Sequence, residues 1–155
     1  MVSEPSPVTI RTARPDDAAA LIALLVGGSL RPQQETADDP SPYRAALVEI
    51  AATPGCTVLV AEADGQVVGM VQVITFRHLQ HRGGRCAELE SMHVARAHRS
   101  RGIGGQLLAA AATFAKRQGC YRIQLTSNAE RPDAHRFYER YGFQRTHEGF
   151  KLPLA

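Results

Sequence analysis

One heptapeptide stands out in this sequence: Arg99-Ser100-Arg101-Gly102-Ile103-Gly104-Gly105. It follows a β-rich stretch and precedes apolar residues at helical spacing, which predicts a strand, a turn and a helix. At such a turn the free N–H groups of the first helical turn and the positive end of the helix dipole converge. Glycines let an anion come close, and the arginines add charge. The segment therefore predicts a seat for a phosphate or pyrophosphate; the alternative is a plain glycine turn entering a helix.

Two better-known glycine motifs are excluded. A P-loop ends in Gly-Lys-Ser/Thr, and no lysine lies near this turn. The dinucleotide-binding fingerprint needs a third glycine where Leu107 stands, and it usually follows the first strand of the chain. The ligand is therefore expected to be phosphorylated, but to be neither a nucleoside triphosphate nor NAD.

The periodicity around this turn predicts one mixed α/β domain. Strands are expected at 8–11, 57–61, 67–76, 87–94 and 121–126, with short ones near Phe143 and at 150–152. Helices are expected at 15–25, 43–52, 103–118 and 133–141, and Asp64-Gly65 predicts a hairpin. The resulting order is β-α-α-β-β-β-α-β-α-β-β. No linker divides the chain, so we expect a single domain over residues 1–155, of which 1–7 form a flexible N-terminus.

Composition indicates an ordinary soluble globular protein. The 155 residues are 44% hydrophobic and 21% charged, which excludes disordered and fibrous classes. The three cysteines form no C-x-x-C pair, so neither a zinc site nor a disulfide framework is indicated. The N-terminus has no signal-peptide pattern, and the longest apolar runs are about half a membrane span. We expect a cytoplasmic protein with no metal and no membrane contact.

The basic residues are unevenly placed. The net charge is +3, and all but two of the 18 basic residues are arginines. Six of them lie between residues 77 and 101, against two glutamates: Arg77, Arg82, Arg85, Arg96, Arg99 and Arg101. No aromatic residues interleave this segment as single-stranded nucleic acid binding would require. The pattern favours a cofactor that carries a pyrophosphate and a ribose phosphate over nucleic acid.

At this point the sequence resembles a known family. Arg99-x-x-Gly102-x-Gly104 is similar to the Arg/Gln-x-x-Gly-x-Gly/Ala signature of the GNAT N-acetyltransferase superfamily. The segment 88–94 resembles its fourth strand, and 134–143 resembles its closing helix, with an aromatic-Tyr pair followed by Gly-Phe. The resemblance covers about residues 8–153. The sequence departs at Ser100, where many members carry glycine.

The resemblance implies a centrally splayed β-sheet flanked by helices, with acetyl-CoA as cosubstrate. In the family the pantetheine arm lies where the fourth and fifth strands separate at a bulge, and by resemblance the backbone of Met92 and Val94 binds it here. A backbone N–H near Met92 or His93 would polarise the thioester carbonyl. Asn128 would bind the arm or fix the next loop. The implied coenzyme-binding residues are Met92, His93, Val94, Arg99, Ser100, Arg101, Gly102, Ile103, Gly104, Gly105, Asn128 and Phe137.

Catalysis requires a base, because an alkyl amine has a solution pKa of about 10. Glu88 and Glu90 are two residues apart on one strand and are expected to share a face. In the family a carboxylate in this stretch acts as the base, often through a water, and alignment favours Glu88. The alternative is that both glutamates pair with arginines such as Arg85 or Arg122.

Tyr138 is the candidate acid for the coenzyme thiolate, by its place in the Phe137-Tyr138 pair. A core tyrosine with a satisfied hydroxyl is the alternative, and Tyr141 is expected to pack. His93 is one position out of phase with the glutamates, so it is expected on the opposite face, as a core or surface group rather than a second base.

The acceptor is not determined by the sequence. The loop acids Glu35, Asp38 and Asp39 would suit a cationic amine, whereas Arg77, His78, His81 and Arg82 would suit an acidic substrate. An amino acid, a polyamine, an aminoglycoside, a protein N-terminus and a lysine all stay open. We expect direct transfer in a ternary complex; the alternative is a non-catalytic acyl-CoA-binding regulatory domain of the same fold. A homodimer is compatible with the sequence but not indicated by it.

Overall fold

The computed structural model describes residues 7–154 and divides into two compact units, Met1–Gln124 and Leu125–Ala155. The predicted flexible N-terminus, residues 1–7, lies outside the described residues except for Pro7. Each unit is described by itself below.

Apart from the short α3 (Gln80–Gly83), which the sequence did not predict, the first unit has its strands and helices in the predicted order. It contains β1 (Thr9–Thr12), α1 (Ala18–Gly28), α2 (Ser41–Ala52), β2 (Cys56–Ala63), β3 (Gln66–Arg77), the short α3 (Gln80–Gly83), β4 (Arg85–Val94) and α4 (Ile103–Arg117). β5 (Cys120–Leu125) ends the unit and carries the boundary between the two. Single 3₁₀ turns lie at Pro15–Asp17, Pro32–Gln34 and Arg96–His98.

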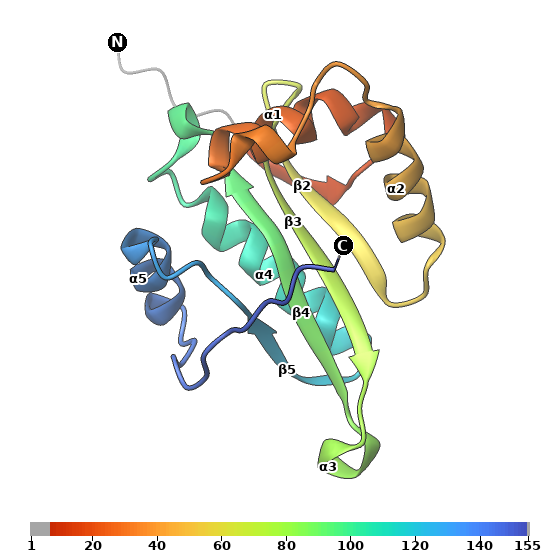
Figure 1. Cartoon of the computed structure of the whole chain (residues 1–155), viewed down its shortest axis with the longest axis vertical. Coiled ribbons are helices and arrows are strands. Elements are labelled where there is room, and N and C mark those ends of the chain that lie inside the picture. The colour runs from red at the N-terminus through yellow and green to blue at the C-terminus, as the bar shows by residue number, and fades with distance from the viewer. Residues whose placement is uncertain (1–6, 155) are drawn as a thin grey trace. The chain divides into compact units, whose positions relative to one another are not determined.

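The five strands form one sheet in the order β1-β2-β3-β4-β5, as Figure 1 shows. The pairs from β1 to β4 are antiparallel. Asp64 and Gly65 form the two-residue turn between β2 and β3, with φ values of 52° and 72°. Two positive φ angles in succession define a type I′ turn, so the predicted Asp-Gly hairpin is confirmed.

Helices cover both faces of the sheet (Figure 1). On one face Leu21 and Leu24 of α1 and Leu47 of α2 pack in a buried cluster with Val60 and Met70 of the strands. On the other face Leu107 of α4 lies against Gly69, next to Met70 and therefore on the opposite side of β3. The predicted α/β architecture of a sheet between helices is confirmed.

The second unit contains α5 (Pro132–Arg140) and the chain that follows it. The strands predicted near Phe143 and at 150–152 are wrong, because residues 143–154 form no strand. Nearly all of these residues are exposed, including Phe150 at 91% and Leu152 at 83%. The prediction relied on scattered β-rich residues, but an isolated segment gains no strand without a partner ladder.

Candidate active site

A β-bulge interrupts β4 in the middle of the predicted site. Gln72 of β3 pairs with Glu90 and Met70 pairs with His93, so Val71 alone faces two residues, Ser91 and Met92. Ser91 has a φ of 50°, in the left-handed region that glycine usually occupies in such bulges. A bulge at this point of β4, expected from the resemblance, is therefore present, with serine where glycine would be less strained.

The bulge changes which side chains share a face. Residues directly opposite one another in an antiparallel ladder point to the same side. Glu88, Glu90 and His93 face Ile74, Gln72 and Met70 respectively, and these three residues of β3 alternate onto one face. The prediction that His93 points away from the glutamates is wrong, because the extra residue of the bulge shifts the alternation by one.

His93 lies against the end of α1. A Cβ added to Gly28 would stand 2.1 Å from the imidazole Nδ1, so only glycine leaves room for this ring. Met70, opposite His93, belongs to the cluster under α1 and α2. The glutamates and His93 therefore occupy the sheet face that α1 and α2 cover, opposite to α4.

Glu88 is the better held of the two glutamates. It is half-buried, and its Oε2 accepts a hydrogen bond of 2.7 Å from the Gln124 side-chain amide, whereas Glu90 is exposed. Arg85 donates to Thr75 Oγ1 at 3.3 Å, and within residues 7–154 neither Arg85 nor Arg122 forms an ion pair with a glutamate. The described residues therefore do not form the ion pairs with arginine that were the alternative role for these two glutamates.

The predicted glycine loop has the left-handed backbone that is typical of anion-binding turns before a helix. Ser100 and Gly102 have φ values of 60° and 76°, and Gly102 precedes the first residue of α4. The N-cap supplies no side-chain hydrogen bond, so the N–H groups of the first turn are left for another partner. A Cβ on Gly102 would meet nothing within 4 Å, so the space above it is open. An anion fits this geometry.

Arg99 joins the loop to the end of β4. Its Nε donates to the carbonyl oxygen of Val94 at 3.1 Å, while its side chain stays exposed. The backbone N–H of Ala95 meanwhile donates to Val68 at 2.8 Å. The last residues of β4 are thus held from two sides.

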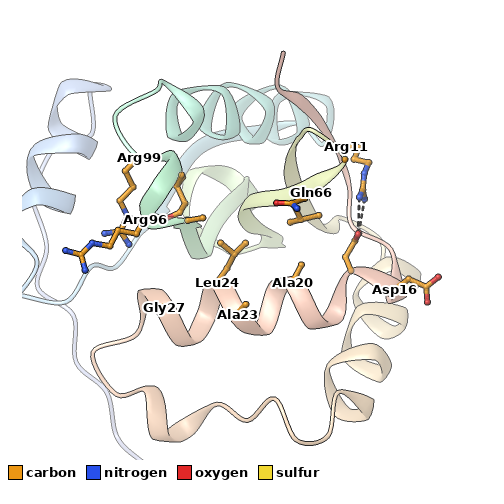
Figure 2. Close-up of a pocket in the computed structure, with 14 residues that line it drawn as sticks. Arg11, Asp16, Ala20, Ala23, Leu24, Gly27, Gln66, Arg96 and Arg99 are labelled. Carbon is orange, nitrogen blue, oxygen red and sulfur yellow. Dashed lines mark hydrogen bonds and ion pairs between the residues drawn. The ribbon is translucent and has the colours of Figure 1, made fainter. Parts of the chain in front are cut away.

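A pocket of about 550 Å³ adjoins this end of β4. Figure 2 shows Ala20, Ala23 and Gly27 of α1 along one wall, with Arg99 at one end and Arg11 at the other. The volume suits a small molecule. Neither Glu88 nor Glu90 lines it, so it is separate from the predicted base.

Arg11 at the far end of the pocket is neutralised by two carboxylates. Its guanidinium lies 2.8 Å from Asp17 and 2.7 Å from Glu62, which ties β1 to the start of α1 and to β2. The hydrogen bond from Arg11 lowers the pKa of Asp17 below its ordinary value. The cationic end of the pocket is therefore the Arg99 end, where Arg96 is also exposed.

The acidic loop before α2 is partly engaged by its own neighbours. Glu35 accepts a hydrogen bond of 2.6 Å from the Tyr43 hydroxyl, and Asp39 accepts one of 2.9 Å from the Ser41 N–H. Asp38 is exposed. Of the three acids, Asp38 alone lacks a side-chain bond of this kind among the described residues.

The second unit holds the candidate acid Tyr138. Burial raises the pKa of its phenol above the ordinary value, and the charge of Arg131 opposes this by less. Its ring packs edge-to-face against Phe137 and Phe143, with centroid distances of 5.2 and 5.6 Å. Asn128 Oδ1 accepts from the Glu130 N–H at 2.9 Å and so caps the turn before α5.

Among residues 7–154 no group of three or more His, Cys, Asp or Glu side chains is arranged to hold a metal ion. None of the described helices combines the length and the apolar character needed to cross a bilayer.

The comparisons with known proteins agree on one family. A model described as "Acetyltransferase (GNAT) family" matches residues 27–143, and so extends across the boundary between the two units. An aminoalkylphosphonate N-acetyltransferase of Salmonella typhimurium is 36% identical over 101 residues. That alignment covers 65% of this chain and 65% of the relative, just under two thirds of each.

Two solved structures match nearly the whole chain. One, from Bacillus halodurans C-125 and described as a transcriptional regulator, is 37% identical with a TM-score of 0.90, covering 96% of this chain and 100% of that one. Another, described as a putative acetyltransferase from Agrobacterium tumefaciens str. C58, is 25% identical with a TM-score of 0.83, covering 94% and 99%.

Proposed function

Because the chain belongs to the Acetyltransferase (GNAT) family and is an acyltransferase, we propose that it moves an acetyl group from acetyl-CoA directly to a primary amine. One observation carries this proposal: Glu88, the bulge at Ser91 and the uncapped glycine loop follow one another on a single segment of chain. A candidate base and a candidate anion seat thus lie on either side of a break in the strand ladder.

The loop supports acetyl-CoA as cosubstrate. When bound, acetyl-CoA supplies an acetyl group activated as a thioester. We assign its pyrophosphate to the N–H groups of Ile103, Gly104 and Gly105, with Arg99 and Arg101 adding charge. The left-handed backbone at Ser100 and Gly102 supports this assignment, because it turns successive N–H groups toward one point.

The bulge supports the second part of the coenzyme contact. The extra residue leaves backbone groups of Ser91 and Met92 out of the regular ladder with β3. We propose that the backbone of Met92, His93 and Val94 binds the pantetheine arm and polarises the acetyl carbonyl, and that Asn128 and Phe137 complete the coenzyme contacts. The bond from Arg99 to the Val94 carbonyl leaves the Val94 N–H as the group for this role.

Glu88 is the proposed base. It accepts the proton of the amine nitrogen, directly or through a water, so that the lone pair can attack. Its half-buried position and its neutral hydrogen-bond partner support this role, while Glu90, exposed on the same face, is the second candidate.

Tyr138 is the proposed acid, which donates its hydroxyl proton to the leaving sulfur. Its ring packs with Phe137 and Phe143 in an aromatic cluster that fixes the direction of the hydroxyl, and the resemblance assigns the acid to this position. This role requires both units to act as one catalytic domain over residues 1–155, and the family match that extends across their boundary supports this.

For the acceptor we propose a small molecule with a primary amine. The 36% identical relative is named for aminoalkylphosphonates, which are small amines with an anionic group. A cytoplasmic location, supported by three free thiols, and a homodimer stay predictions.

The competing function is a coenzyme-binding regulator without turnover. This alternative is supported by the description of the 37% identical structure as a transcriptional regulator. Free-thiol release from acetyl-CoA across an amine library, including aminoalkylphosphonates, separates the two. Turnover that is lost in Glu88→Gln supports the enzyme; acetyl-CoA binding without release for any amine supports the regulator.

A further inference from the structure

Two part-buried hydrogen bonds connect Cys86 to the carboxylate of Glu88 through Gln124. Cys86 and Glu88 alternate onto one face of β4, and Gln124 projects from the neighbouring strand β5. The Gln124 Nε2 lies 2.7 Å from Glu88 Oε2, and the Gln124 Oε1 lies 3.4 Å from Cys86 Sγ. One side-chain amide therefore bridges a thiol and a carboxylate.

The chemistry of the three groups fixes which way the amide points. An ionised carboxylate only accepts hydrogen bonds, while a thiol offers a weak S–H donor. The amide therefore turns its NH₂ toward Glu88 and its carbonyl toward Cys86, and the flipped orientation would face an oxygen toward the carboxylate. Cys86 is completely buried, so its thiol cannot turn to water, and its other acceptor, the carbonyl oxygen of Ala87, lies farther away at 3.6 Å.

We infer that Gln124 is a positioning residue for Glu88, and that Cys86 fixes the orientation of Gln124. The inference rests on the proposed function, in which Glu88 is the base. The amide holds Oε2 at charge-assisted distance and leaves Oε1 as the oxygen that receives the proton. A neutral amide restrains the carboxylate without placing a full positive charge beside it, as an arginine would.

The test compares Gln124→Met with wild type. Methionine keeps the length of glutamine but neither donates nor accepts in this way. We expect kcat to fall by roughly ten- to a hundredfold, because a base moved from its productive geometry loses rate steeply. The KM for acetyl-CoA should stay at the wild-type value, and so should the rise in melting temperature that acetyl-CoA causes. A general loss of structure would change both.

Gln118→Met is the matched control. Gln118 is also half-buried but follows the end of α4, outside the proposed machinery. Its kcat should equal that of wild type. A second pair covers the case in which Gln124→Met does not fold: Cys86→Ala should lower kcat at constant KM, and Cys86→Ser, which keeps a donor, should restore part of it.

The two proposals fail in different ways. If Glu88→Gln keeps the wild-type rate, the base assignment is wrong and the role of Gln124 falls with it. If Glu88→Gln is inactive while Gln124→Met keeps the wild-type kcat, the positioning role alone is overturned. It is also overturned if kcat and the stabilisation by acetyl-CoA fall together.

Discussion

The imidazole of His93 fills the space that a side chain on Gly28 would need, with Nδ1 2.1 Å from the ideal Cβ position. This contact brings the last residue of α1 onto the face of β4 that carries the glutamates. The end of α1 therefore packs against β4 with no room for a side chain at position 28.

Gly28→Ala should destabilise the protein. The new methyl group must displace the ring of His93, and overpacking of this kind costs about 1–3 kcal/mol. The free energy of unfolding from urea titration measures the loss. Turnover should fall as well, because His93 adjoins the bulge.

Gly27→Ala is the neighbouring control. A Cβ at Gly27 meets nothing within 4 Å, so alanine should leave stability unchanged or raise it by up to about 1 kcal/mol. Equal stability of the two variants would mean that the ring of His93 moves aside without cost.

Gly102→Ala should weaken acetyl-CoA binding. The φ of 76° disfavours any residue with a Cβ by about 1–2 kcal/mol, and relaxation of the turn would redirect the N–H groups of the loop. The shift in melting temperature at saturating acetyl-CoA measures this, since a ligand stabilises the folded state by mass action.

Gly119→Ala provides a control with the same backbone cost. Gly119 has a φ of 74° and open space around it, but it follows the opposite end of α4. It should lose similar stability while keeping the full shift with acetyl-CoA. A shift that is intact in Gly102→Ala would argue against the loop as the coenzyme seat.

Tyr138→Phe should lower kcat by roughly a hundredfold and leave the stabilisation by acetyl-CoA nearly intact. The phenol, whose pKa is raised by burial, is the proposed proton donor, and general acids contribute on this order. Tyr141→Phe, at an exposed tyrosine three residues on, is the control and should match wild type. An unchanged rate in Tyr138→Phe would remove the acid role.

Asp17→Asn should flatten the loss of stability in acid. The pKa of Asp17 is lowered in the folded protein, chiefly by the hydrogen bond from Arg11, so its stabilisation is present above about pH 4 and lost as the pH falls further. At neutral pH the variant should lose about 1.5–3 kcal/mol, the range of hydrogen bonds to charged groups.

Unfolding measured between pH 6 and pH 3 tests this, with the exposed neighbour Asp16→Asn as control. The control should follow the wild-type profile. A variant Asp17→Asn whose profile also follows wild type would show that the pair with Arg11 contributes little to the fold.

Features set by local backbone chemistry were predictable from the sequence. Asp64-Gly65 makes its turn because both residues tolerate positive φ, and the glycine loop opens α4 for the same reason. The main helices and strands followed from hydrophobic periodicity, within a few residues at their ends.

Features set by register or by distant partners were not predictable. The bulge has serine in the left-handed conformation, and the residue type gives no sign of this in the sequence. The extra residue places His93 on the face opposite to the one expected. The proposed role of Gln124 was not predictable, because it depends on a hydrogen bond to a residue 36 positions away, and a glutamine in an alternating strand is usually a solvent-facing polar residue. The prediction of terminal strands was wrong because β-rich residues alone do not provide a neighbouring strand to pair with.

The bulge at Ser91 also sets what a one-codon deletion would do to this protein. Without Ser91 the ladder runs regularly, with Glu90 still opposite Gln72 and His93 still opposite Met70, since Met92 then faces Val71 alone. Glu88, Glu90 and His93 keep their shared face, and the break in the ladder is lost. Deletion of Ser91 would thus remove the bulge and keep the two glutamates and His93 on one face.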